Sequence, residues 1–530
     1  MKENFKQMTF KRIALLHTIG FLVVVIFNVT PWYFLMLTVA QLIFVPITLQ
    51  LILKKENRLY YYFAIPAFAS IFILQTTTTT EWDILLAGIY LLFTLVVAIY
   101  GLHRFIQRGF DHLEEFSIDA GMMYLFIGGM WFFASVTEID TGFSPILTWL
   151  TAIHFHYSSF LLPIFVGFLG RLSKRKTYNI ICSVILISPI VVALGITFSP
   201  WLELVSVLLY IFGIYGLIVL AIKSVFPNKL QKTLVLISFG ALGTTIIFSL
   251  LYAVGNVFGV FALSIDFMLK FHGFFNSILF ALCGVVGWSI LAPKTKEIKS
   301  KFPISSIRGK YVIGEQILYK HLGKETYKGL VDDMGIYLEK RFLSATIIDL
   351  YENTNQFRLY SEVNWHNWFK PFAAIYRFFS RNVQQLNLPY TNTQMEMTGE
   401  IIAVEDGRKN TRAWLRKIGK EVIFVALYSS HHRNDKYYMN IALPLPWSSM
   451  IGILELNQNG EKLVLTSKGA KGSDAGIYLA FRQNVFRLPL QEQFIIEEIK
   501  DNQLTAKHHM RICSIPFLTI QYNINKRSPS

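Results

Sequence analysis

The chain has 530 residues, of which 53% are hydrophobic and 16% are charged. This composition is far more apolar than that of an ordinary soluble protein, and the length suffices for at least two domains. The formal net charge is +16, but no nucleic-acid motif accompanies the basic residues, so we expect no DNA or RNA partner. The three cysteines lie far apart, which excludes a disulfide framework and a CxxC metal site.

Long apolar stretches fill the first half of the chain. A bilayer core about 30 Å thick needs about 20 mostly apolar helical residues, and we find about ten such stretches. They lie at residues 12–29, 32–53, 60–75, 82–101, 118–137, 146–169, 178–198, 202–222, 232–254 and 267–291. We therefore expect a transmembrane domain over residues 1–293, a basic linker at 294–310 and a cytoplasmic domain at 311–530.

Basic residues mark one side of the predicted bundle. Of the 17 Lys and Arg before residue 294, 16 lie at alternate connections, and Lys270 is the exception. Such residues on short loops stay in the cytoplasm during insertion, so we expect a multi-pass protein of the bacterial inner membrane with both termini cytoplasmic. Topology alone explains these residues, and binding of anionic lipid head groups is the alternative. The clusters are Lys2/Lys6/Lys11/Arg12, Lys54/Lys55/Arg58, Arg104/Arg108, Arg171/Lys174/Arg175/Lys176 and Lys223/Lys229/Lys232.

Two histidines and several hydroxyl groups interrupt the sixth apolar stretch. Ionisable side chains at bilayer depth are costly and mark pathways, relays or ligands. Thr151, His154 and Ser158 follow spacings of three and four, so they share one helical face. His156 points roughly 200° around the helix from His154. An undistorted helix therefore cannot present both rings to one small metal ion, and we expect separate roles for them.

The tenth apolar stretch carries a second polar group. Asp266 and Lys270 are four residues apart and can pair, while His272 and Asn276 are four apart on a different face. The connections opposite the basic ones are acidic, and an acidic mouth above buried histidines would favour cations or protons. The other interpretation is that hydroxyl groups of neighbouring helices satisfy each histidine within ordinary bundle packing.

Alternating polar and apolar residues follow a helical start at 315–330. They predict about nine strands, from MTGEIIAVE to FLTIQYNI, with short connections. Asn459-Gly460 is a hairpin signal, because both turn positions take positive φ. The expected fold class is therefore a membrane all-α bundle followed by a cytoplasmic β-rich α+β domain, with an antiparallel sheet that is curved or closed into a barrel.

An amphipathic helix is predicted near residues 371–384. Pro371 suits its first turn, and Phe372, Ile375 and Phe379 recur on one face. Either this helix lies on the inner membrane surface with its aromatic side down, or it covers the open side of the curved sheet as part of the domain's own core.

The predicted soluble domain shows no enzyme signature. Its His and Asp pairs share no motif, and it has neither a Gly-rich phosphate loop nor a GxSxG nucleophile. His508 and His509 are neighbours on a predicted strand, so they point to opposite faces.

Three segments resemble one known family. HFHYSSFLLPIFVG on the sixth stretch, and LPLPWSSMIGILEL and PFLTIQYNI in the second half, are similar to the bacterial YndJ-like membrane proteins, and the similarity extends over most of the chain. The resemblance implies the two-part architecture described above and leans toward transport. It supplies no catalytic residue that could be carried over to His154 or His156.

Three functions are compatible with these observations. The first is a transporter or permease for an unknown small solute, in which the polar residues of the sixth and tenth stretches line a route and the β domain binds a small apolar ligand or lipid. The second is a membrane enzyme whose histidines bind haem or metal, or act as acid and base on a lipid. The third is an envelope sensor or scaffold with a lipid-binding tail. The sequence identifies the lipid bilayer as a partner and no particular cofactor.

Overall fold

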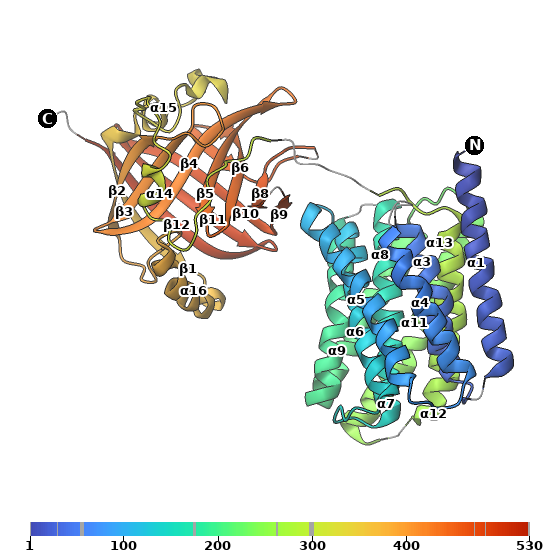
Figure 1. Ribbon diagram of the computed structural model, residues 1–530. Helices are drawn as coiled ribbons and strands as arrows, with labels where there is room; N and C mark the ends of the chain where they lie inside the picture. Colours follow the sequence, from blue (N-terminus) through green and yellow to red (C-terminus); the bar gives the residue numbers. More distant parts are fainter. Residues whose placement is uncertain are drawn as a thin grey trace. The chain divides into compact units, whose positions relative to one another are not determined.

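The structure is a computed structural model that describes residues 2–28, 30–53, 58–172, 176–260, 263–295, 302–470, 472–482 and 484–527. It divides into two compact units, the first of Met1–Phe105 and His112–Glu297, the second of Ile106–Asp111 and Ile298–Ser530 (Figure 1). Several of the predicted basic residues lie outside the described residues: Lys54, Lys55, Lys174, Arg175, positions 296–301 of the linker, and the side chains of Lys2, Lys6, Lys11 and Arg58.

Helices build the first unit. Among the described residues, eight helices are long and apolar enough to cross a membrane, and two shorter apolar helices cover Arg12–Phe27 and Tyr60–Thr76. The predicted helical bundle is thereby confirmed. In chain order the helices are α1 (Lys2–Phe27), α2 (Phe34–Val39), α3 (Val45–Ile52), α4 (Arg58–Thr76), α5 (Asp83–Arg108), α6 (Leu113–Val136), α7 (Pro145–His156), α8 (Leu162–Leu172), α9 (Lys176–Phe198), α10 (Pro200–Ile222), α11 (Lys229–Phe258), α12 (Ile265–Phe267) and α13 (Cys283–Ile290).

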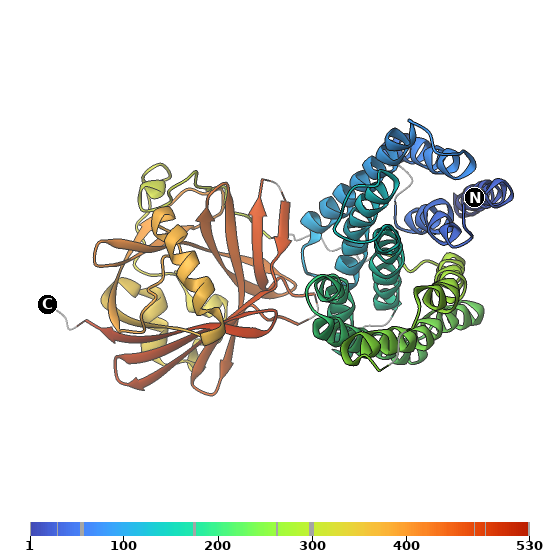
Figure 2. The same ribbon diagram turned by 90° about the horizontal axis from the view of Figure 1, so that it is seen from below.

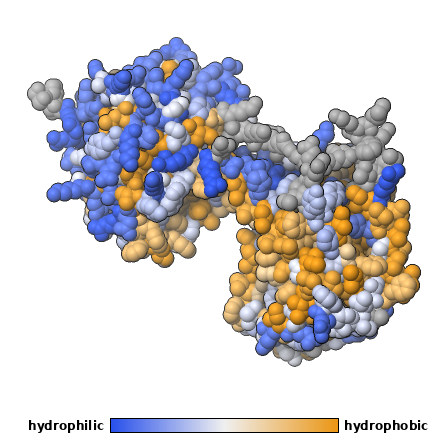
Figure 3. Space-filling view, in the orientation of Figure 1, coloured by the Kyte–Doolittle hydropathy of each residue, from blue (hydrophilic) through white to orange (hydrophobic). Residues whose placement is uncertain are grey.

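The outer surface of the bundle is apolar. Leu208, Phe212 and Val219 of α10, for example, are exposed, and Figure 3 shows hydrophobic side chains over most of the visible face of this unit. In hydrocarbon such side chains need no protein partner, while every backbone group is satisfied inside its own helix. The bundle is therefore built for a lipid surrounding.

π-helical turns interrupt three of the spans. η1 (Ala40–Phe44) separates α2 from α3, η2 (Tyr157–Leu161) separates α7 from α8, and η3 (Met268–Gly273) and η4 (Asn276–Leu282) lie between α12 and α13. Such turns are rare and often occur at functional sites. Those on the sixth and tenth stretches fall beside the polar residues that the sequence singled out.

α6 begins at Leu113, five residues before the predicted stretch at 118–137. Its first turns contain Glu114, Glu115 and Asp119, and all three carboxylates are buried. A span predicted from hydropathy leaves out residues such as Glu114 and Glu115, because an ionised group is expected to stay in water. Arginines of neighbouring helices pair with Glu115 and Asp119, and Nδ1 of His112 lies 3.4 Å from Glu114, so the carboxylates stay inside.

Glycines bring α6 and α8 close together. A Cβ added at Gly121 would lie 2.9 Å from the backbone oxygen of Phe160, and one at Gly167 would lie 2.5 Å from that of Glu114. Neither position has room for a side chain, since the helix backbones approach each other directly there.

The second unit is a closed antiparallel barrel. Ten strands form a ring in the order β5-β4-β3-β2-β1-β12-β11-β10-β7-β6, and pairing of β5 with β6 closes it, while β8 and β9 branch from β6. The predicted antiparallel β domain is confirmed. Of the two predicted forms, a curved sheet and a closed barrel, the structure has the closed barrel. The strands are β1 (Phe357–Trp365), β2 (Met395–Ala403), β3 (Arg412–Ile418), β4 (Glu421–Arg433), β5 (Lys436–Leu445), β6 (Ser448–Asn459), β7 (Lys462–Thr466), β8 (Gly476–Phe481), β9 (Asn484–Arg487), β10 (Leu490–Lys500), β11 (Gln503–Ile512) and β12 (Ile515–Lys526).

The nine predicted strands are all present, and β1, β3 and β9 are additional. β1 alternates buried and more exposed residues, but the polar Ser361 occupies one of its buried positions. In β3, Arg412 is buried, and Arg416 packs its guanidinium over the rings of Trp414 and Phe424. Because polar residues stand at inward positions, the apolar alternation that identifies a strand is broken.

Two apolar cores lie on the two faces of the sheet. The first fills the interior of the ring with side chains from all ten of its strands, such as Leu359, Met439 and Ile520. The second lies outside β3–β6 and β8, where Phe302, Ile307 and Ile313 pack against the sheet. The helical start predicted at 315–330 contains one short helix, α14 (Gln316–Tyr319), and α15 (Ala345–Glu352) packs on the interior core.

α16 (Lys370–Val383) is the helix at the position predicted for an amphipathic one. Figure 2 shows it lying across one end of the barrel. Only Ala373 and Ser380 are buried, so small residues form the edge that packs on the barrel. Phe372, Ile375 and Phe379, which the sequence places on one face, are exposed.

The Asn459-Gly460 signal marks a real hairpin, shifted by one residue. Asn459 is still paired with Lys462, so Gly460 and Glu461 form the turn. Gly460 has φ of 62°, and neither neighbour has a positive φ. The turn thus has a single left-handed residue, and glycine supplies it.

Candidate functional site

His156 is the most enclosed of the predicted route residues. It ends α7 and has no exposed surface. Its Nδ1 lies 2.8 Å from the backbone oxygen of Ala152, and because a carbonyl only accepts, Nδ1 carries the proton. Nε2 then accepts the hydroxyl hydrogen of Tyr90 on α5, at 2.8 Å. Protein atoms therefore match both nitrogens of a neutral ring.

Gln41 of η1 lies beside the same tyrosine hydroxyl. The side chain has no exposed surface, and apart from this contact with Tyr90, which falls short of ordinary hydrogen-bond geometry, neither its nitrogen nor its oxygen has a hydrogen-bond partner among the described residues. Leaving a buried polar group without a partner costs about 1–3 kcal/mol, so such groups are rare. Gln41, Tyr90 and His156 form a buried polar site whose amide has hydrogen-bonding capacity that the protein does not use.

Gly128 of α6 fixes the position of the His156 ring. A Cβ at this glycine would lie 2.9 Å from Nδ1 of His156 and 3.1 Å from Cβ of Phe155. The helix backbone therefore packs flat against the imidazole. Together with its two hydrogen bonds, this contact leaves the ring one orientation, in which Nε2 points to Tyr90.

Tyr157 joins three spans at their π-helical turns. Its hydroxyl donates to the backbone oxygen of Met36 at 2.7 Å and lies 2.9 Å from Oγ of Ser277 on η4. Since the single phenolic hydrogen goes to the carbonyl, Ser277 is the donor of the second bond. Phe44 of η1 packs edge-on to the same ring at 6.0 Å between centroids. η1, η2 and η4 therefore meet around one side chain.

His272 and Asn276 form a second polar group, on the tenth stretch. Nδ1 of His272 donates to the backbone oxygen of Thr245 at 3.1 Å, and Nε2 accepts from the Asn276 amide at 3.3 Å. The amide oxygen of Asn276 accepts from the Thr245 hydroxyl at 2.8 Å. This ring is also matched at both nitrogens.

The remaining predicted residues bond locally. The hydroxyls of Thr151 and Ser158 and Nδ1 of His154 each contact the backbone carbonyl four residues earlier, at 2.7–2.8 Å. His154 is exposed, and its Nε2 has no partner among the described residues. Asp266 and Lys270 form the expected ion pair at 2.7 Å, with both side chains exposed.

The structure therefore brings together Asp266 with Lys270 and His272 with Asn276. In the described part of the chain, no hydrogen bond joins the three histidines to one another. No group of three or more His, Cys, Asp or Glu that could hold a metal ion occurs among the described residues.

Sequence analysis missed a buried ion-pair cluster. Arg171 of α8 donates through Nε and Nη2 to the two carboxylate oxygens of Glu115, each at 2.7 Å. Nε of Arg104 on α5 lies 3.0 Å from Asp119, and its Nη2 lies 3.4 Å from Glu115. All four side chains are at most 10% exposed. A bidentate arginine–carboxylate pair is the strong form of this interaction, and here it joins α5, α6 and α8.

Comparisons with known proteins extend these observations. A sequence model of the YndJ-like protein family matches residues 35–280. The uncharacterized membrane protein YndJ of Bacillus subtilis (strain 168) is 40% identical over 484 residues, which cover 88% of each chain. The chain belongs to the YndJ-like family. No solved structure matches it.

The YndJ-like match contains every polar group described above. Residues 35–280 include Gln41, Tyr90, His156 and Asn276, as well as the ion-pair cluster on α5, α6 and α8. The longer match to the Bacillus subtilis protein covers 88% of the chain, so it must extend into the barrel. Parts of both units are therefore shared with the Bacillus subtilis protein.

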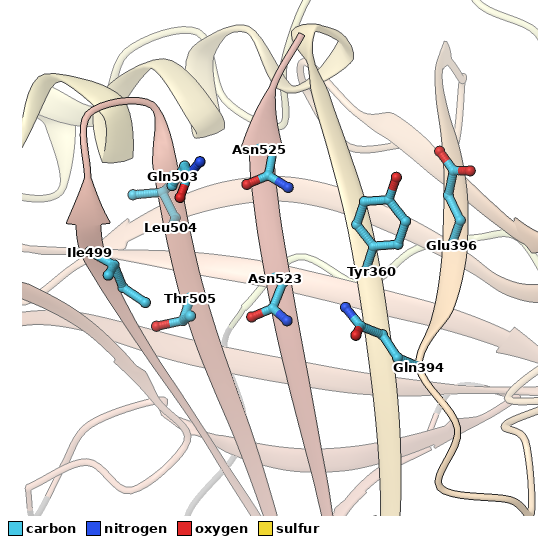
Figure 4. Close-up of a pocket in the computed structure, with 9 residues that line it drawn as sticks. All are labelled: Tyr360, Gln394, Glu396, Ile499, Gln503, Leu504, Thr505, Asn523 and Asn525. Carbon is cyan, nitrogen blue, oxygen red and sulfur yellow. The ribbon is translucent and has the colours of Figure 1, made fainter.

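Two hollows lie on the barrel unit of this YndJ-like protein. One, of about 660 Å³, is a shallow depression on the outer face of the sheet. Figure 4 shows its amide and hydroxyl groups side by side on neighbouring strands. Its one charged lining group is a carboxylate, so it offers hydrogen bonds but no positive charge. The lining residues are Tyr360, Gln394, Glu396, Ile499, Gln503, Leu504, Thr505, Asn523 and Asn525.

The other hollow, of about 860 Å³, is basic and aromatic. Burial, together with the nearby Arg408, lowers the pKa of the Arg308 guanidinium in its wall. Trp447 is 54% exposed there and has φ of 52°, a strained conformation for a bulky residue. The lining residues are Ile304, Ser305, Ser306, Arg308, Gly309, Lys310, Trp447, Phe481 and Arg482.

Proposed function

We propose that this YndJ-like membrane protein is a permease for a small polar solute or ion. The observation that carries the proposal is Gln41, a buried amide that touches the Tyr90 hydroxyl but makes no hydrogen bond of ordinary geometry among the described residues, beside the Tyr90–His156 hydrogen bond. A polar solute at this position would take up hydrogen bonds that the protein leaves unused, so its desolvation would be compensated.

The proposed route combines this site with the predicted polar residues. Asp266 and Lys270, exposed at the start of α12 and η3, would meet the solute first. His272 and Asn276 lie further along the same span, and the exposed His154, with Thr151 and Ser158 on its helical face, lies on α7 and η2. The π-helical turns support this role, because such turns are frequent at functional sites.

We further propose that the protein lies in the bacterial cytoplasmic membrane with both termini in the cytoplasm. The distribution of Lys and Arg supports this orientation. Figure 1 is consistent with it, since the N-terminus of α1 is at one end of the bundle and the starts of α7 and α12 are at the other.

The test uses the full-length protein in proteoliposomes, with proton flux followed by a trapped pH-sensitive dye and other ions and solutes by electrical recording. Gln41→Leu keeps the volume of the side chain and removes its amide, so we expect at least a tenfold loss of flux with normal folding. Gln50→Leu is the matched control, because Gln50 is a partly buried glutamine of the same span. Wild-type flux in Gln41→Leu, or an equal loss in Gln50→Leu, would contradict the proposed route.

The basic hollow favours a second function, binding of an anionic amphiphile by the barrel unit. Arg308, Lys310 and Arg482 provide positive charge, no carboxylate lines the hollow, and Trp447 and Phe481 provide an apolar surface. A carboxylate or phosphate group on a short apolar chain has this combination of properties.

Binding of a fluorescent fatty acid and of the corresponding neutral alcohol to the purified full-length protein tests this function. We expect tighter binding of the acid, and about a tenfold loss of its affinity in Arg308→Gln/Lys310→Gln. Lys436→Gln is the control, since Lys436 is an exposed barrel lysine outside the hollow. Equal binding of acid and alcohol would rule out anion recognition at this hollow.

A further inference from the structure

α16 carries an exposed apolar stripe. Phe378 is 72% exposed, Ile375 62%, Phe379 59% and Phe372 57%. At about 100° per residue, Phe372, Ile375, Tyr376 and Phe379 share one face, and Ala373 and Ser380 lie on the next. The helix therefore packs on the barrel through its small residues, while its aromatic side faces away from the protein.

Such a surface indicates a binding partner, since contiguous exposed apolar patches on soluble domains mark interaction sites. Figure 3 shows hydrophobic side chains on the underside of the barrel unit, where Figure 1 places α16, on an otherwise mostly hydrophilic surface. Packing on the barrel explains Ala373 and Ser380 but leaves the aromatic stripe unexplained.

The charges near α16 favour an anionic surface. The helix contains Lys370, Arg377 and Arg381, and no Asp or Glu occurs from residue 363 to 395. Arg381 pairs with Glu421 of β4 at 2.9 Å, so Lys370 and Arg377 carry the unbalanced positive charge. Lys370 and Arg381 are exposed. At about 100° per residue these basic residues lie on the other side of the helix from the apolar stripe. Apolar residues on one side and basic residues on the other are the pattern of helices that lie in the interface of a bilayer containing anionic lipids.

The chain itself keeps a membrane within reach. Residue 290 ends α13, the last helix of the apolar bundle, and residue 302 is already buried in the second unit. The 12 residues between them span at most about 40 Å when fully extended. A bilayer surface is therefore always available to the barrel unit, and a weak interfacial interaction suffices because it is intramolecular.

We propose that α16 binds the surface of the lipid bilayer, with Phe372, Ile375 and Phe379 inserted among the lipids and the basic residues at the head groups. Trp368 and Tyr376, both partly exposed just beside the stripe, suit the boundary between head groups and chains. The barrel is thereby held on the membrane by a contact additional to the linker and to the Ile106–Asp111 segment, which already belongs to the second unit. This inference requires only that the protein is in a membrane and is independent of transport.

The test is depth-dependent quenching in the full-length protein. Cys182, Cys283 and Cys513 are replaced by Ser, and one cysteine at Phe379→Cys carries an environment-sensitive NBD label. The matched control is Arg381→Cys, two residues further and about 200° around the same helix. The protein is placed in nanodiscs of phosphatidylglycerol and phosphatidylcholine, with or without nitroxide-labelled lipid chains.

We expect blue-shifted NBD emission at position 379 with at least twofold quenching by the nitroxide lipids, and little of either at 381. Omitting phosphatidylglycerol should reduce the quenching. Water-like emission at position 379 would overturn the proposal. Blue-shifted emission without quenching would overturn it too, because the stripe would then be covered by protein, such as a second copy or another part of the chain.

A second variant separates loss of lipid contact from misfolding of the protein. The label is moved to Phe372→Cys, and Ile375→Asp/Phe379→Asp is introduced on the exposed stripe, where no core contact is lost. We expect the quenching at 372 to disappear while the thermal unfolding of the protein is unchanged. Quenching that persists despite two carboxylates would show that the apolar stripe is not what contacts lipid.

Discussion

The bundle and the barrel fix their buried histidines in different ways. In the bundle, His156 and His272 donate Nδ1–H to a backbone carbonyl and accept at Nε2 from a tyrosine hydroxyl or an amide. In the barrel, Nε2 of His431 lies 3.2 Å from Asp474, and Nε2 of His508 lies 3.2 Å from Glu492. Dipoles hold the rings in the first unit. In the second unit a carboxylate lies beside each ring, and the Asn440 amide oxygen also contacts Nδ1 of His431 at 2.8 Å.

The difference follows from the surroundings. A charge left unpaired in hydrocarbon is costly, so neutral rings held by dipoles suit a helix that lies in lipid. Where the bundle does contain charges, in the cluster of Arg104, Glu115, Asp119 and Arg171, they are paired and enclosed by three helices. The barrel is a separate unit with a mostly hydrophilic visible surface (Figure 3), and it can place carboxylates beside its histidines.

The largest expected effect comes from breaking the ion-pair cluster of the bundle. Glu115→Ala removes the carboxylate that Arg104 and Arg171 share, and loss of one partner of a buried pair costs about 3–5 kcal/mol. Thermal unfolding in detergent should show a strongly destabilised protein. Lys229→Ala, at an exposed helix start, is the control and should leave the midpoint unchanged; equal midpoints in both variants would mean that the pairs contribute no stability.

The barrel also contains a buried carboxylate, Asp406, whose contribution to the stability of the fold depends on pH. Asp406 is buried and accepts from the Arg408 guanidinium, with Nε–Oδ2 at 2.8 Å, and from the Thr411 hydroxyl at 2.9 Å. Burial raises the pKa of this carboxyl, but the arginine outweighs it, so the pKa is lower than normal. The unfolded chain therefore binds the proton first on acidification, and the stabilisation, present above about pH 4, is lost as pH falls through the folded pKa.

Asp406→Asn should accordingly cost about 1–3 kcal/mol at neutral pH and abolish this part of the acid sensitivity. Hydrogen exchange at Ser306, whose backbone amide donates to the Asp406 carbonyl at 2.8 Å, reports on the site within the full-length protein. If wild type and variant lose protection in parallel between neutral pH and pH 3, the assigned role of the carboxylate is wrong.

A smaller effect on stability is expected at the ring of His156, which hydrogen bonds to neutral groups hold in place. Tyr90→Phe leaves Nε2 of His156 without its donor in a buried site, at a cost of about 1–2 kcal/mol. Tyr62→Phe is the control, since Tyr62 is 73% exposed on the outer face. The unfolding midpoint of Tyr90→Phe should be the lower of the two, and indistinguishable midpoints would mean that this hydrogen bond is energetically neutral.

The smallest effects come from two glycines with open space around them. A Cβ at Gly460 or at Gly240 would have no neighbour within 4 Å, but Gly460 has positive φ in a barrel turn and Gly240 lies inside α11. Gly460→Ala should destabilise by about 1 kcal/mol, and Gly240→Ala should stabilise by about 0.5–1 kcal/mol. Shifts of the same sign in the two variants would show that backbone conformation is not the cause.

The spans were predictable because each is a continuous physical signal, about 20 apolar residues between polar connections. The start of α6 was not, because Glu114 and Glu115 look like loop residues until α5 and α8 are known to bring Arg104 and Arg171 beside that turn. The pairing of helices is a property of the folded bundle, and a single sequence does not encode it in any local pattern.

The candidate site was predictable to a similar extent. The spacing of His154 and His156 predicted different surroundings, and one ring is exposed while the other is buried. Gln41 has no local signal, since a single amide in an apolar run fits any packing, and its lack of partners appears only in three dimensions. In the barrel, the inward Arg412 and Arg416 concealed β3 for the same reason.

The closed ring also constrains the order of assembly. Phe357 at the start of β1 pairs with Lys526 at the end of β12, so the ring remains open until the ribosome has released both ends of that pairing. Helices inserted during translation would already anchor the nascent chain, and the open sheet would have unpaired edges close to a membrane during that interval. Premature termination between β1 and β12 would therefore yield an anchored polypeptide with exposed edges, a natural substrate for membrane-bound quality-control proteases.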